Sequence, residues 1–521
     1  MNRESMLNQL RERGEEPWDL LVIGGGATGL GTAVEAASRG YQTVLVEQHD
    51  FAKGTSSRST KLVHGGVRYL QQGDIGLVFE ALHERGLLRQ NAPHLVHNLA
   101  FVIPNYEWWN GPFYTLGMKI YDAMAGKLGL GPSQHISKEE TMKAIPNLKE
   151  EGLHGGVIYY DGQFDDSRLA INLARTAANH GAIVLNYCKV KGLLKSKDHL
   201  VEGVLAEDQE TGETLSIYSR TVINATGVFA DAILQMDEPG APKKISPSQG
   251  IHLVLNKEFL AGDSAIMIPK TTDGRVLFAV PWHHKVVVGT TDTLVKKESL
   301  EPKPLDEEII FVLDTAAQYL TKTPKRSDVK SVFAGLRPLA ASRNGRSTKE
   351  ISRSHKVLVS LSGLISTIGG KWTTYRKMGE DTVNKAILVG DLTERPSITK
   401  SLPIHGATIE EDSGDPLNIY GTDKKLIREL VNKKNEWGEK LHPDLDYTRA
   451  EVIWAARSEM ARTVEDVLAR RLRALFLDAR ASMQMATEVA SLLAAELGRG
   501  KEWEARQVEE YIRLANGYVL A

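Results

Sequence analysis

The sequence is poor in cysteine. Cys188 is the only cysteine among 521 residues, which excludes an intrachain disulfide, a cysteine-rich zinc site, an iron–sulfur cluster and a redox-active cysteine pair. No metal site is expected. Any electron transfer must therefore use a bound organic cofactor.

Long apolar runs are also missing. The first residues, MNRESMLNQLRERGEE, mix arginine with glutamate and lack the apolar core of a secretory signal. The longest uncharged run, LLVIGGGATGLGTAV at 20–34, is shorter than the roughly 20 residues of a membrane span and contains several glycines. We therefore expect a cytoplasmic protein without a spanning helix.

Neither sign of charge is in excess. Lys and Arg number 64 against 66 Asp and Glu, for a net charge of -2, with 42% hydrophobic and 25% charged residues. This composition is typical of globular proteins and argues against disorder and against a dedicated polyanion binder. The length predicts roughly two to four domains.

A nucleotide-binding unit lies near the start. The apolar run 19–23 predicts a buried strand, Gly24, Gly26 and Gly29 form a GxGxxG turn before a predicted helix at 30–39, and a second strand at 43–46 ends in Glu47. The glycines let a pyrophosphate approach the helix N-terminus, and Glu47 accepts hydrogen bonds from a ribose while repelling a 2′-phosphate. The unit therefore predicts binding of FAD or NAD, and not of NADP.

Later segments predict the rest of the fold. Short β-branched runs at 286–288 and 357–359 indicate a mixed α/β region up to about residue 395. From about residue 424 glycine and proline are scarce and apolar residues recur at helical spacing, which predicts a helical C-terminal domain. We expect Arg470, Arg471 and Arg473 to lie on a solvated helix face. The alternative is that they contact phospholipid or a partner.

Several motifs, in this order, carry a family resemblance: SSRSTKLVHGGVRYLQ, NATGVFAD, GTTD, AGLRPL and IGGKWTTYRK. The whole chain resembles the FAD-dependent glycerol-3-phosphate dehydrogenases, which are similar to the glycine and D-amino-acid oxidases. The resemblance implies an α/β fold with a Rossmann-like FAD-binding domain, a mixed-sheet substrate domain and a C-terminal all-helical domain. It places the oxidoreductase region at 17–395 (FAD-binding segments 17–75, 150–240 and 330–395, substrate segments 76–149 and 241–329) and the helical domain at 396–521.

The resemblance implies FAD as the cofactor. The matched positions implied to surround it are Gly24, Gly26, Thr28, Gly29, Glu47, Thr55, Ser56, Ser57, Lys61, Leu62, His64, Ala225, Thr226, Gly227, Gly370, Lys371 and Thr373. Lys371 or the backbone N–H groups near it are suited to stabilising negative charge on the reduced flavin.

The resemblance also implies the substrate, sn-glycerol 3-phosphate. Arg68, Arg337 and Arg353 match the phosphate-binding positions, and Tyr69 adds a hydroxyl; arginine binds phosphate oxygens in pairs. Oxidation of the C2 alcohol requires a base, for which His64 and His252 are the candidates, with Lys371 as an alternative stabiliser of the alkoxide.

The motifs specify the electron acceptor less closely than the cofactor or the substrate. We find no second dinucleotide-binding unit that would serve a nicotinamide. The resemblance therefore implies a quinone as acceptor, reached from the inner face of the cell membrane by peripheral attachment. Whether the chain forms a homo-oligomer stays open. The aromatic segment 106–124 is either a membrane contact or an interior helix. The alternatives are an oxidase of the same fold that uses oxygen, on glycerol 3-phosphate or an amine, and a flavoprotein without turnover.

Overall fold

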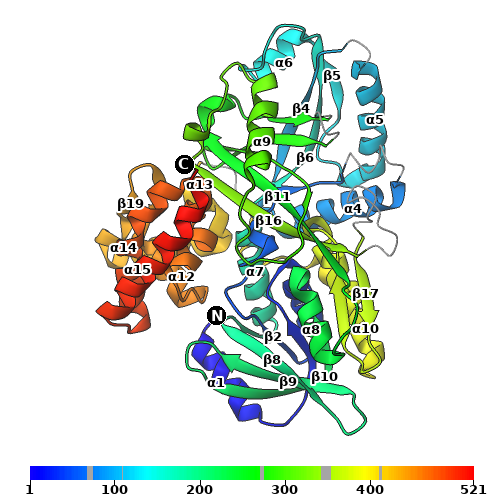
Figure 1. Cartoon of the computed structure of the whole chain (residues 1–521), viewed down its shortest axis with the longest axis vertical. Coiled ribbons are helices and arrows are strands. Elements are labelled where there is room, and N and C mark those ends of the chain that lie inside the picture. Colours follow the sequence, from blue (N-terminus) through cyan, green and yellow to red (C-terminus); the bar gives the residue numbers. More distant parts are fainter. Residues whose placement is uncertain are drawn as a thin grey trace.

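The computed structural model describes residues 1–66, 74–107, 110–269, 271, 275–341, 354–409 and 414–520, with the backbone alone at 110–113. Two sheets stand one above the other, and the C-terminal helices pack against one side of them (Figure 1). The lower sheet contains the predicted nucleotide-binding unit, and the upper sheet contains most of the predicted substrate segments.

The lower sheet has eight strands in the described part of the chain. Its main path is β17 (Lys356–Val359), β18 (Ile365–Ile368), β10 (Thr214–Asn224), β1 (Trp18–Ile23), β2 (Thr43–Val46) and β7 (Ile183–Leu185). From β18 to β7 every neighbouring pair is parallel. A hairpin of β8 (Cys188–Lys195) and β9 (Val201–Asp208) extends β10.

The predicted strand, helix and second strand are confirmed. Helix α2 (Ala27–Ser38) begins earlier than the sequence predicts because Gly26, in extended conformation, is its N-cap. It packs against α7 (Asp166–Asn179) and α10 (Tyr375–Val389). The strands beneath this helical layer are buried, as the continuous apolar runs predict.

The upper sheet has ten strands in the described part. They are β15 (Thr293–Leu294), β11 (Ile245–Asn256), β14 (Lys285–Gly289), β13 (Leu277–Trp282), β12 (Ala265–Ile268), β4 (Val96–Asn105), β6 (Gly155–Phe164) and β3 (Leu62–Val63), with β16 (Ser331–Ala340) beside β11 and β5 (Gln134–Ile136) beside β6. Strands β3, β6 and β16 fall within the segments predicted for FAD binding, yet they pair in this sheet. The chain therefore crosses between the sheets within those segments.

Further helices surround the sheets. They are α1 (Arg3–Arg13), α4 (Ile75–Asn91), α5 (Asn110–Ala125), α6 (Lys138–Ala144), α8 (Ala230–Asp237) and α9 (Asp306–Tyr319). Helix α5 covers part of the aromatic segment 106–124. Its Met118 and Tyr121 are buried, whereas Leu116 is 65% exposed. The segment is therefore partly interior and partly surface.

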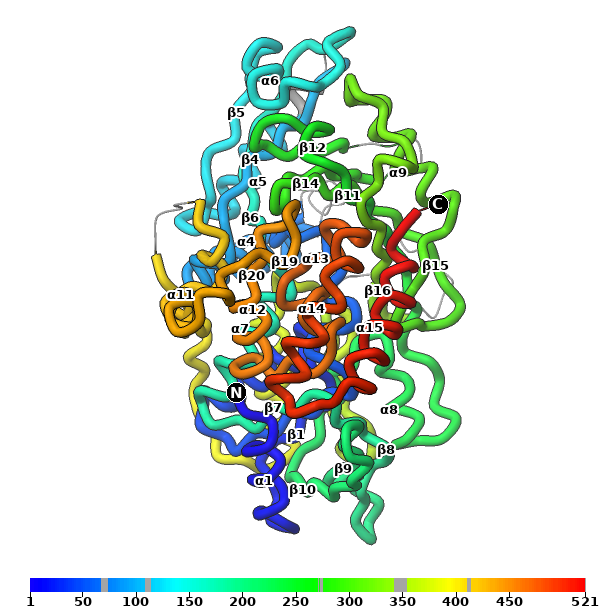
Figure 2. The backbone as a smooth tube through the Cα atoms, turned by 90° about the vertical axis from the view of Figure 1, so that its left-hand side faces the viewer, coloured from blue at the N-terminus to red at the C-terminus, as the bar shows by residue number. Residues whose placement is uncertain are grey.

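The C-terminal domain is helical, as predicted, with one short hairpin. Its helices are α11 (Lys424–Lys433), α12 (Arg449–Ser458), α13 (Ala474–Leu477), α14 (Ala479–Leu497) and α15 (Lys501–Ala515), and the hairpin is β19 (Lys440–His442) with β20 (Leu445–Thr448). Figure 2 shows these helices lying across the middle of the molecule. Their core is continuous with Val254, Trp282, Val287 and Phe333 of the upper sheet.

The prediction of a solvated arginine face is wrong. Arg470, Arg471 and Arg473 are 3%, 1% and 1% exposed. The segment is a π-helix over Asp466–Arg471 followed by Arg473 in the left-handed conformation, instead of a regular helix. Helical spacing correctly marks the apolar face, but the arginines are also covered, because they pair with Asp50 in the loop after β2 and with Asp166 of α7.

Candidate functional site

The candidate site lies where parallel strands of the lower sheet end. The GGG turn follows β1, Glu47 follows β2, Ala225–Gly227 follow β10, and Gly369–Lys371 follow β18. Parallel strands bring their carboxyl ends to one edge, and a strand order that reverses about β1 leaves a crevice there. These segments, distant in sequence, line one cavity.

The glycine turn is sterically fixed. Gly24 has φ +110°, and a Cβ on it would lie 2.7 Å from the carbonyl oxygen of Ala225. A Cβ on Gly29 would lie 1.8 Å from the oxygen of Gly24, so the helix could not pack on the turn. The turn therefore presents the α2 N-terminus to the cavity, as an anionic pyrophosphate requires.

Glu47 is oriented by the turns on either side of it. Its carboxylate accepts hydrogen bonds from the backbone N–H of Gly25 at 2.7 Å and of His49 at 2.8 Å. Burial raises the pKa of this carboxyl, and the two backbone donors oppose the shift. A carboxylate held in this way at the cavity wall is suited to accept ribose hydroxyls.

The middle of the cavity is closed by two segments that contact each other. The Nε1 of Trp372 donates to the carbonyl oxygen of Ser56 at 2.8 Å, and the ring packs against Phe164. The hydroxyl of Ser56 accepts from the N–H of Ala27 at 2.9 Å. Trp372 thus joins the IGGKWTT turn to the polar segment that follows Glu47.

Most predicted cofactor residues line this cavity. They are Gly24, Gly26, Thr28, Glu47, Thr55, Ser56, Ala225, Thr226, Gly227, Gly370 and Lys371. The cavity extends from the glycine turn to Lys371, and its wall combines helix N–H groups, a carboxylate and hydroxyls. This arrangement fits an extended dinucleotide such as FAD.

Three predicted cofactor residues lie behind the wall. Gly29 is a buried residue of α2 that faces the oxygen of Gly24, and Ser57 is also buried. The Lys61 ammonium is fully buried 2.6 Å from Asp166 and 2.7 Å from the carbonyl oxygen of Ser57. Burial lowers the pKa of Lys61 to about 7, although Asp166 opposes the shift. The Lys61 side chain therefore supports the wall and points away from the cavity.

Two smaller cavities continue from the first. One shares Thr55, Gly370 and Lys371 with it and adds His64, His252, Arg337 and Thr373. The other shares Leu62, His64 and Arg337 and adds Tyr159, Arg275 and Asp292. The predicted catalytic and phosphate-binding groups within the described chain thus surround one continuous space beside the inner end of the dinucleotide cavity.

The two histidines have different surroundings. His252 is buried, its ring stacks on Phe333, and its Nε2 lies 2.9 Å from the hydroxyl of Thr60. Burial, with Lys61 and Arg337 nearby, lowers the pKa of His252 well below its usual value, so its imidazole is neutral at pH 7. The backbone N–H of His64 donates to the Thr373 hydroxyl at 3.3 Å.

Arg337 extends from β16 into this space. Its guanidinium donates to the carbonyl oxygen of Thr291 at 3.0 Å and to the hydroxyl of Thr290 at 3.2 Å, and it lies 3.4 Å from Asp292. These contacts hold the guanidinium in one orientation at the cavity wall. A preoriented guanidinium is suited to a phosphate ligand.

Some site residues fall outside this description or were not predicted. Arg68, Tyr69 and Arg353 lie outside the described residues. The sequence reasoning missed Arg275, for which no motif gave a signal, and Asp292, which stands in the quoted GTTD motif. It also missed Cys188 and Val190, which line the outer end of the dinucleotide cavity and follow the parallel strand β7.

We predict that Gly26→Val gives folded protein with little flavin. A Cβ on Gly26 would lie 3.1 Å from the Ser56 hydroxyl, and valine would also occupy the space of the pyrophosphate. Overpacking of this kind costs about 1–3 kcal/mol, which weakens binding roughly tenfold or more. The measurement is flavin absorbance per folded protein, with Gly192→Val as the control because no atom lies within 4 Å of a Cβ there. Full occupancy in Gly26→Val would contradict the role given to the turn.

The chain is similar to known flavoproteins over nearly its full length. Residues 19–376 match a family described as FAD dependent oxidoreductase, and residues 397–506 match the C-terminal domain of alpha-glycerophosphate oxidase. A probable mitochondrial glycerol-3-phosphate dehydrogenase of Caenorhabditis elegans is 40% identical over 98% of this chain and 74% of its own. The mitochondrial glycerol-3-phosphate dehydrogenase of Rattus norvegicus is 38% identical over 99% and 75%.

Solved structures agree with these matches. The glycerol-3-phosphate dehydrogenase of Bacillus halodurans, complexed with FAD, superposes with a TM-score of 0.80 at 30% identity and covers 99% of this chain and 97% of its own. L-alpha-glycerophosphate oxidase of Mycoplasma pneumoniae, at 18% identity and a TM-score of 0.57, covers 74% of this chain and 98% of its own and shares the fold. The chain therefore belongs to the FAD-dependent oxidoreductases, in the family of the glycerol-3-phosphate dehydrogenases, and its cofactor is FAD.

Proposed function

We propose that the protein oxidises sn-glycerol 3-phosphate to dihydroxyacetone phosphate and passes the electrons to a membrane quinone. The observation that carries this proposal is the polar space around Arg337, which opens beside the inner end of the FAD cavity. The relatives named glycerol-3-phosphate dehydrogenase support the choice of substrate.

Arg337 is proposed to bind the phosphate. A phosphomonoester carries nearly two negative charges at neutral pH, and Arg275 lines the same cavity as Arg337. The Thr290 and Thr291 segment orients Arg337 before substrate arrives, which reduces the entropy lost on binding. Arg68, Tyr69 and Arg353 remain proposed as further ligands from segments outside the described chain.

The C2 hydroxyl of the substrate must lose a proton while the hydrogen bonded to C2 leaves as a hydride equivalent. When bound, FAD would supply the acceptor for the hydride equivalent and the redox centre from which the electrons pass to the proposed quinone. His252 is proposed as the base: its neutral imidazole can accept a proton, although the burial that lowers its pKa also makes it a weaker base. The Thr60 hydroxyl 2.9 Å from its Nε2 fixes the ring. His64 lines the same space and remains the alternative base. Lys371 is proposed to stabilise negative charge there because it lines both the FAD cavity and this space.

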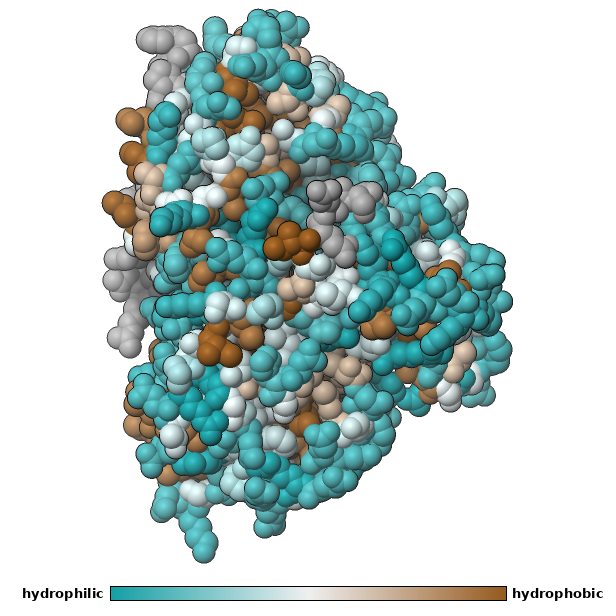
Figure 3. Space-filling model, turned by 180° about the vertical axis from the view of Figure 1, so that it is seen from behind, coloured by the Kyte–Doolittle hydropathy of each residue, from teal (hydrophilic) through white to brown (hydrophobic). Residues whose placement is uncertain are grey.

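Contact with a quinone requires contact with the membrane surface. Among the described residues, we find no helix with the length and hydropathy of a bilayer span. Helices α4 and α5 nevertheless expose Ile75, Phe79, Leu116 and Ile120 at 61%, 58%, 65% and 47%. They lie on the side opposite the C-terminal domain, and Figure 3 shows hydrophobic side chains along that edge. We propose this α4–α5 surface as the site of peripheral membrane attachment.

Anaerobic titration tests the function directly. Adding sn-glycerol 3-phosphate to the yellow holoenzyme is expected to bleach the flavin band, and a soluble quinone is expected to restore it. Recovery with oxygen but not with quinone would instead indicate an oxidase. A flavin that stays oxidised with this substrate, yet bleaches with an amine, would overturn the substrate assignment.

Substitution of Arg337 tests the phosphate site. Arg337→Ala removes a charge-assisted hydrogen-bond donor, which contributes about 1.5–3 kcal/mol, so KM for glycerol 3-phosphate is expected to rise at least about tenfold. The flavin spectrum should not change. Arg326→Ala, an exposed arginine paired with Asp306 at 3.0 Å, is the control. An unchanged KM in Arg337→Ala would exclude it as a phosphate ligand.

Substitutions on the α4–α5 surface test attachment. Burying a Phe or Leu side chain contributes about 1.5–3 kcal/mol, so Phe79→Ser with Leu116→Ser should reduce binding to phospholipid vesicles by at least about a hundredfold. Sedimentation with vesicles measures this. Ile310→Ser on α9, 52% exposed in the native chain, is the control. Equal loss in both variants, or no binding by the native protein, would contradict the proposed surface.

A further inference from the structure

The segment after β2 forms one wall of the FAD cavity. We define residues 47–57 as the cofactor loop. Glu47, His49, Lys53, Thr55 and Ser56 of this loop line the cavity. On the inner side, the N–H of Ala52 donates to the carbonyl oxygen of Gly25 at 2.9 Å, which attaches the loop to the glycine turn.

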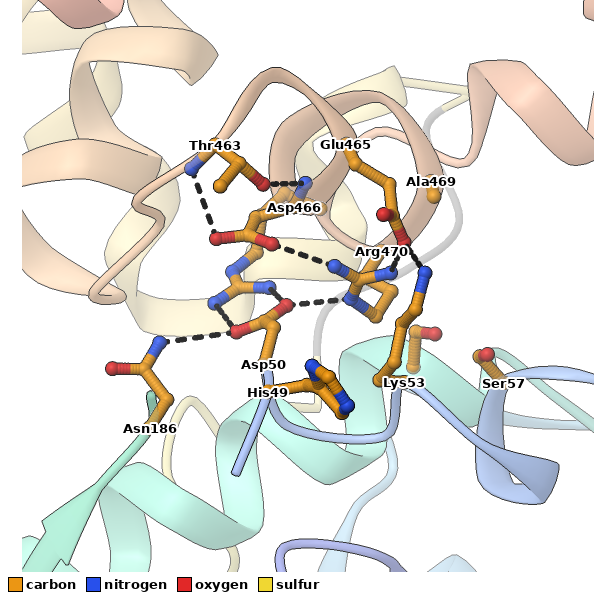
Figure 4. Close-up of polar contacts among 12 residues, drawn as sticks. His49, Asp50, Lys53, Ser57, Asn186, Thr463, Glu465, Asp466, Ala469 and Arg470 are labelled. Atoms are coloured by element: carbon orange, nitrogen blue, oxygen red, sulfur yellow. Dashed lines mark hydrogen bonds and ion pairs between the residues drawn. The ribbon is translucent and has the colours of Figure 1, made fainter. Parts of the chain in front are cut away.

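The outer side of the cofactor loop is attached to the C-terminal domain through Asp50. This aspartate is fully buried. Its carboxylate accepts from Arg470 Nε at 2.6 Å and from Arg471 Nη1 and Nη2 at 2.6 and 3.0 Å, while the amide of Asn186 donates at 3.2 Å. Figure 4 shows Asp50 pointing from the loop toward Arg470.

Two other attachments follow this one along the loop. Lys53 forms an ion pair with Glu465 of the C-terminal domain and lies 2.7 Å from Glu301. At the end of the loop, Arg473 Nη2 donates to the carbonyl oxygen of Ser57 at 3.0 Å. Asp50, Lys53 and Ser57 are thus held by residues of one C-terminal segment, 465–473.

The backbone of that segment explains how neighbouring arginines reach the same carboxylate. In a regular α-helix consecutive residues point about 100° apart. Here the N–H of Leu472 donates to the carbonyl of Val467 at 2.8 Å, five residues back, within the π-helix Asp466–Arg471. A π-turn widens the helix and is frequent at functional sites. Arg470 also contacts Asp466 at 2.6 Å, which fixes its guanidinium.

We propose that Arg470 and Arg471 are positioning residues for FAD, and that the C-terminal domain holds the cofactor loop closed against the dinucleotide through Asp50. Neither arginine lines the FAD cavity, so their effect on the cofactor is transmitted by the loop. The Asp50 carboxylate is fully buried, and both charged partners that hydrogen-bond to it are arginines of the C-terminal domain, so their geometry offsets its desolvation. Opening the loop would separate Asp50 from the two arginines. The free-energy cost of that separation keeps the loop in place when FAD is bound. The proposal rests on FAD and is independent of the substrate and of the electron acceptor.

Release of FAD from the holoenzyme tests the proposal. Arg471→Met leaves Asp50 paired with Arg470, so the charge stays compensated while the two-point contact is lost. FAD is expected to dissociate about tenfold faster, the size of a typical coupling effect, as measured by the fluorescence of released flavin after dilution. Amide hydrogen exchange in residues 47–57 is expected to accelerate in the same variant. At saturating FAD, kcat should match the native value.

Arg175→Met is the matched control. Arg175, on α7, forms a largely buried ion pair with Asp423 and faces Trp454 at 5.2 Å, so it also joins the C-terminal domain to the remainder, but away from the cofactor loop. This variant should keep native FAD release. Arg471→Lys, which keeps the charge without the two-point contact, provides a milder test if Arg471→Met does not fold. Unchanged release in the Arg471 variants, or equal acceleration in Arg175→Met, would overturn the proposal.

Discussion

The parallel pairing of β1 with β2 and β10 is the constraint on which the site depends. It brings four strand ends to one edge, so that the glycine turn, Glu47, Ala225–Gly227 and Gly369–Lys371 face one cavity although the chain separates them widely. Backbone N–H groups at the α2 N-terminus are thereby placed to meet the charge of a bound pyrophosphate. The upper sheet adds Arg337 and His252 at the inner end, where the proposed substrate space begins.

Buried charge is the second organising feature. Burial alone would raise the pKa of Asp50, but Arg471 and Arg470 hold it below its usual range. A similar cluster joins Asp166 to Lys61 and Arg473, at 2.6 and 2.9 Å. Because an isolated buried charge is costly, each partner requires the other in place. The C-terminal domain therefore docks in one position, and it supports the cofactor loop and the strand that follows.

Prediction from sequence succeeds where a local pattern has a single physical meaning. The strand, glycine turn, helix and acidic residue predict the β1–α2–β2 unit, because each glycine permits a backbone approach that a Cβ would block. It fails for Arg470, Arg471 and Arg473, since helical spacing identifies the apolar face and cannot tell whether the other face meets water or a buried carboxylate. It also misses Arg275, which no motif marks and which reaches the cavity only through the folding of the upper sheet.

The sequence by itself determined the nucleotide-binding unit, the exclusion of an intrachain disulfide and of cysteine-rich metal sites and, through its motifs, the flavoprotein family. Local sterics and composition are enough for these conclusions. The tertiary structure decided which side chains share a space: His252 with Thr60, Arg337 with Asp292, and Asp50 with the arginines of the C-terminal domain. Those pairs join residues far apart in the chain, and only the packing of the sheets and of the C-terminal domain brings them within hydrogen-bonding distance.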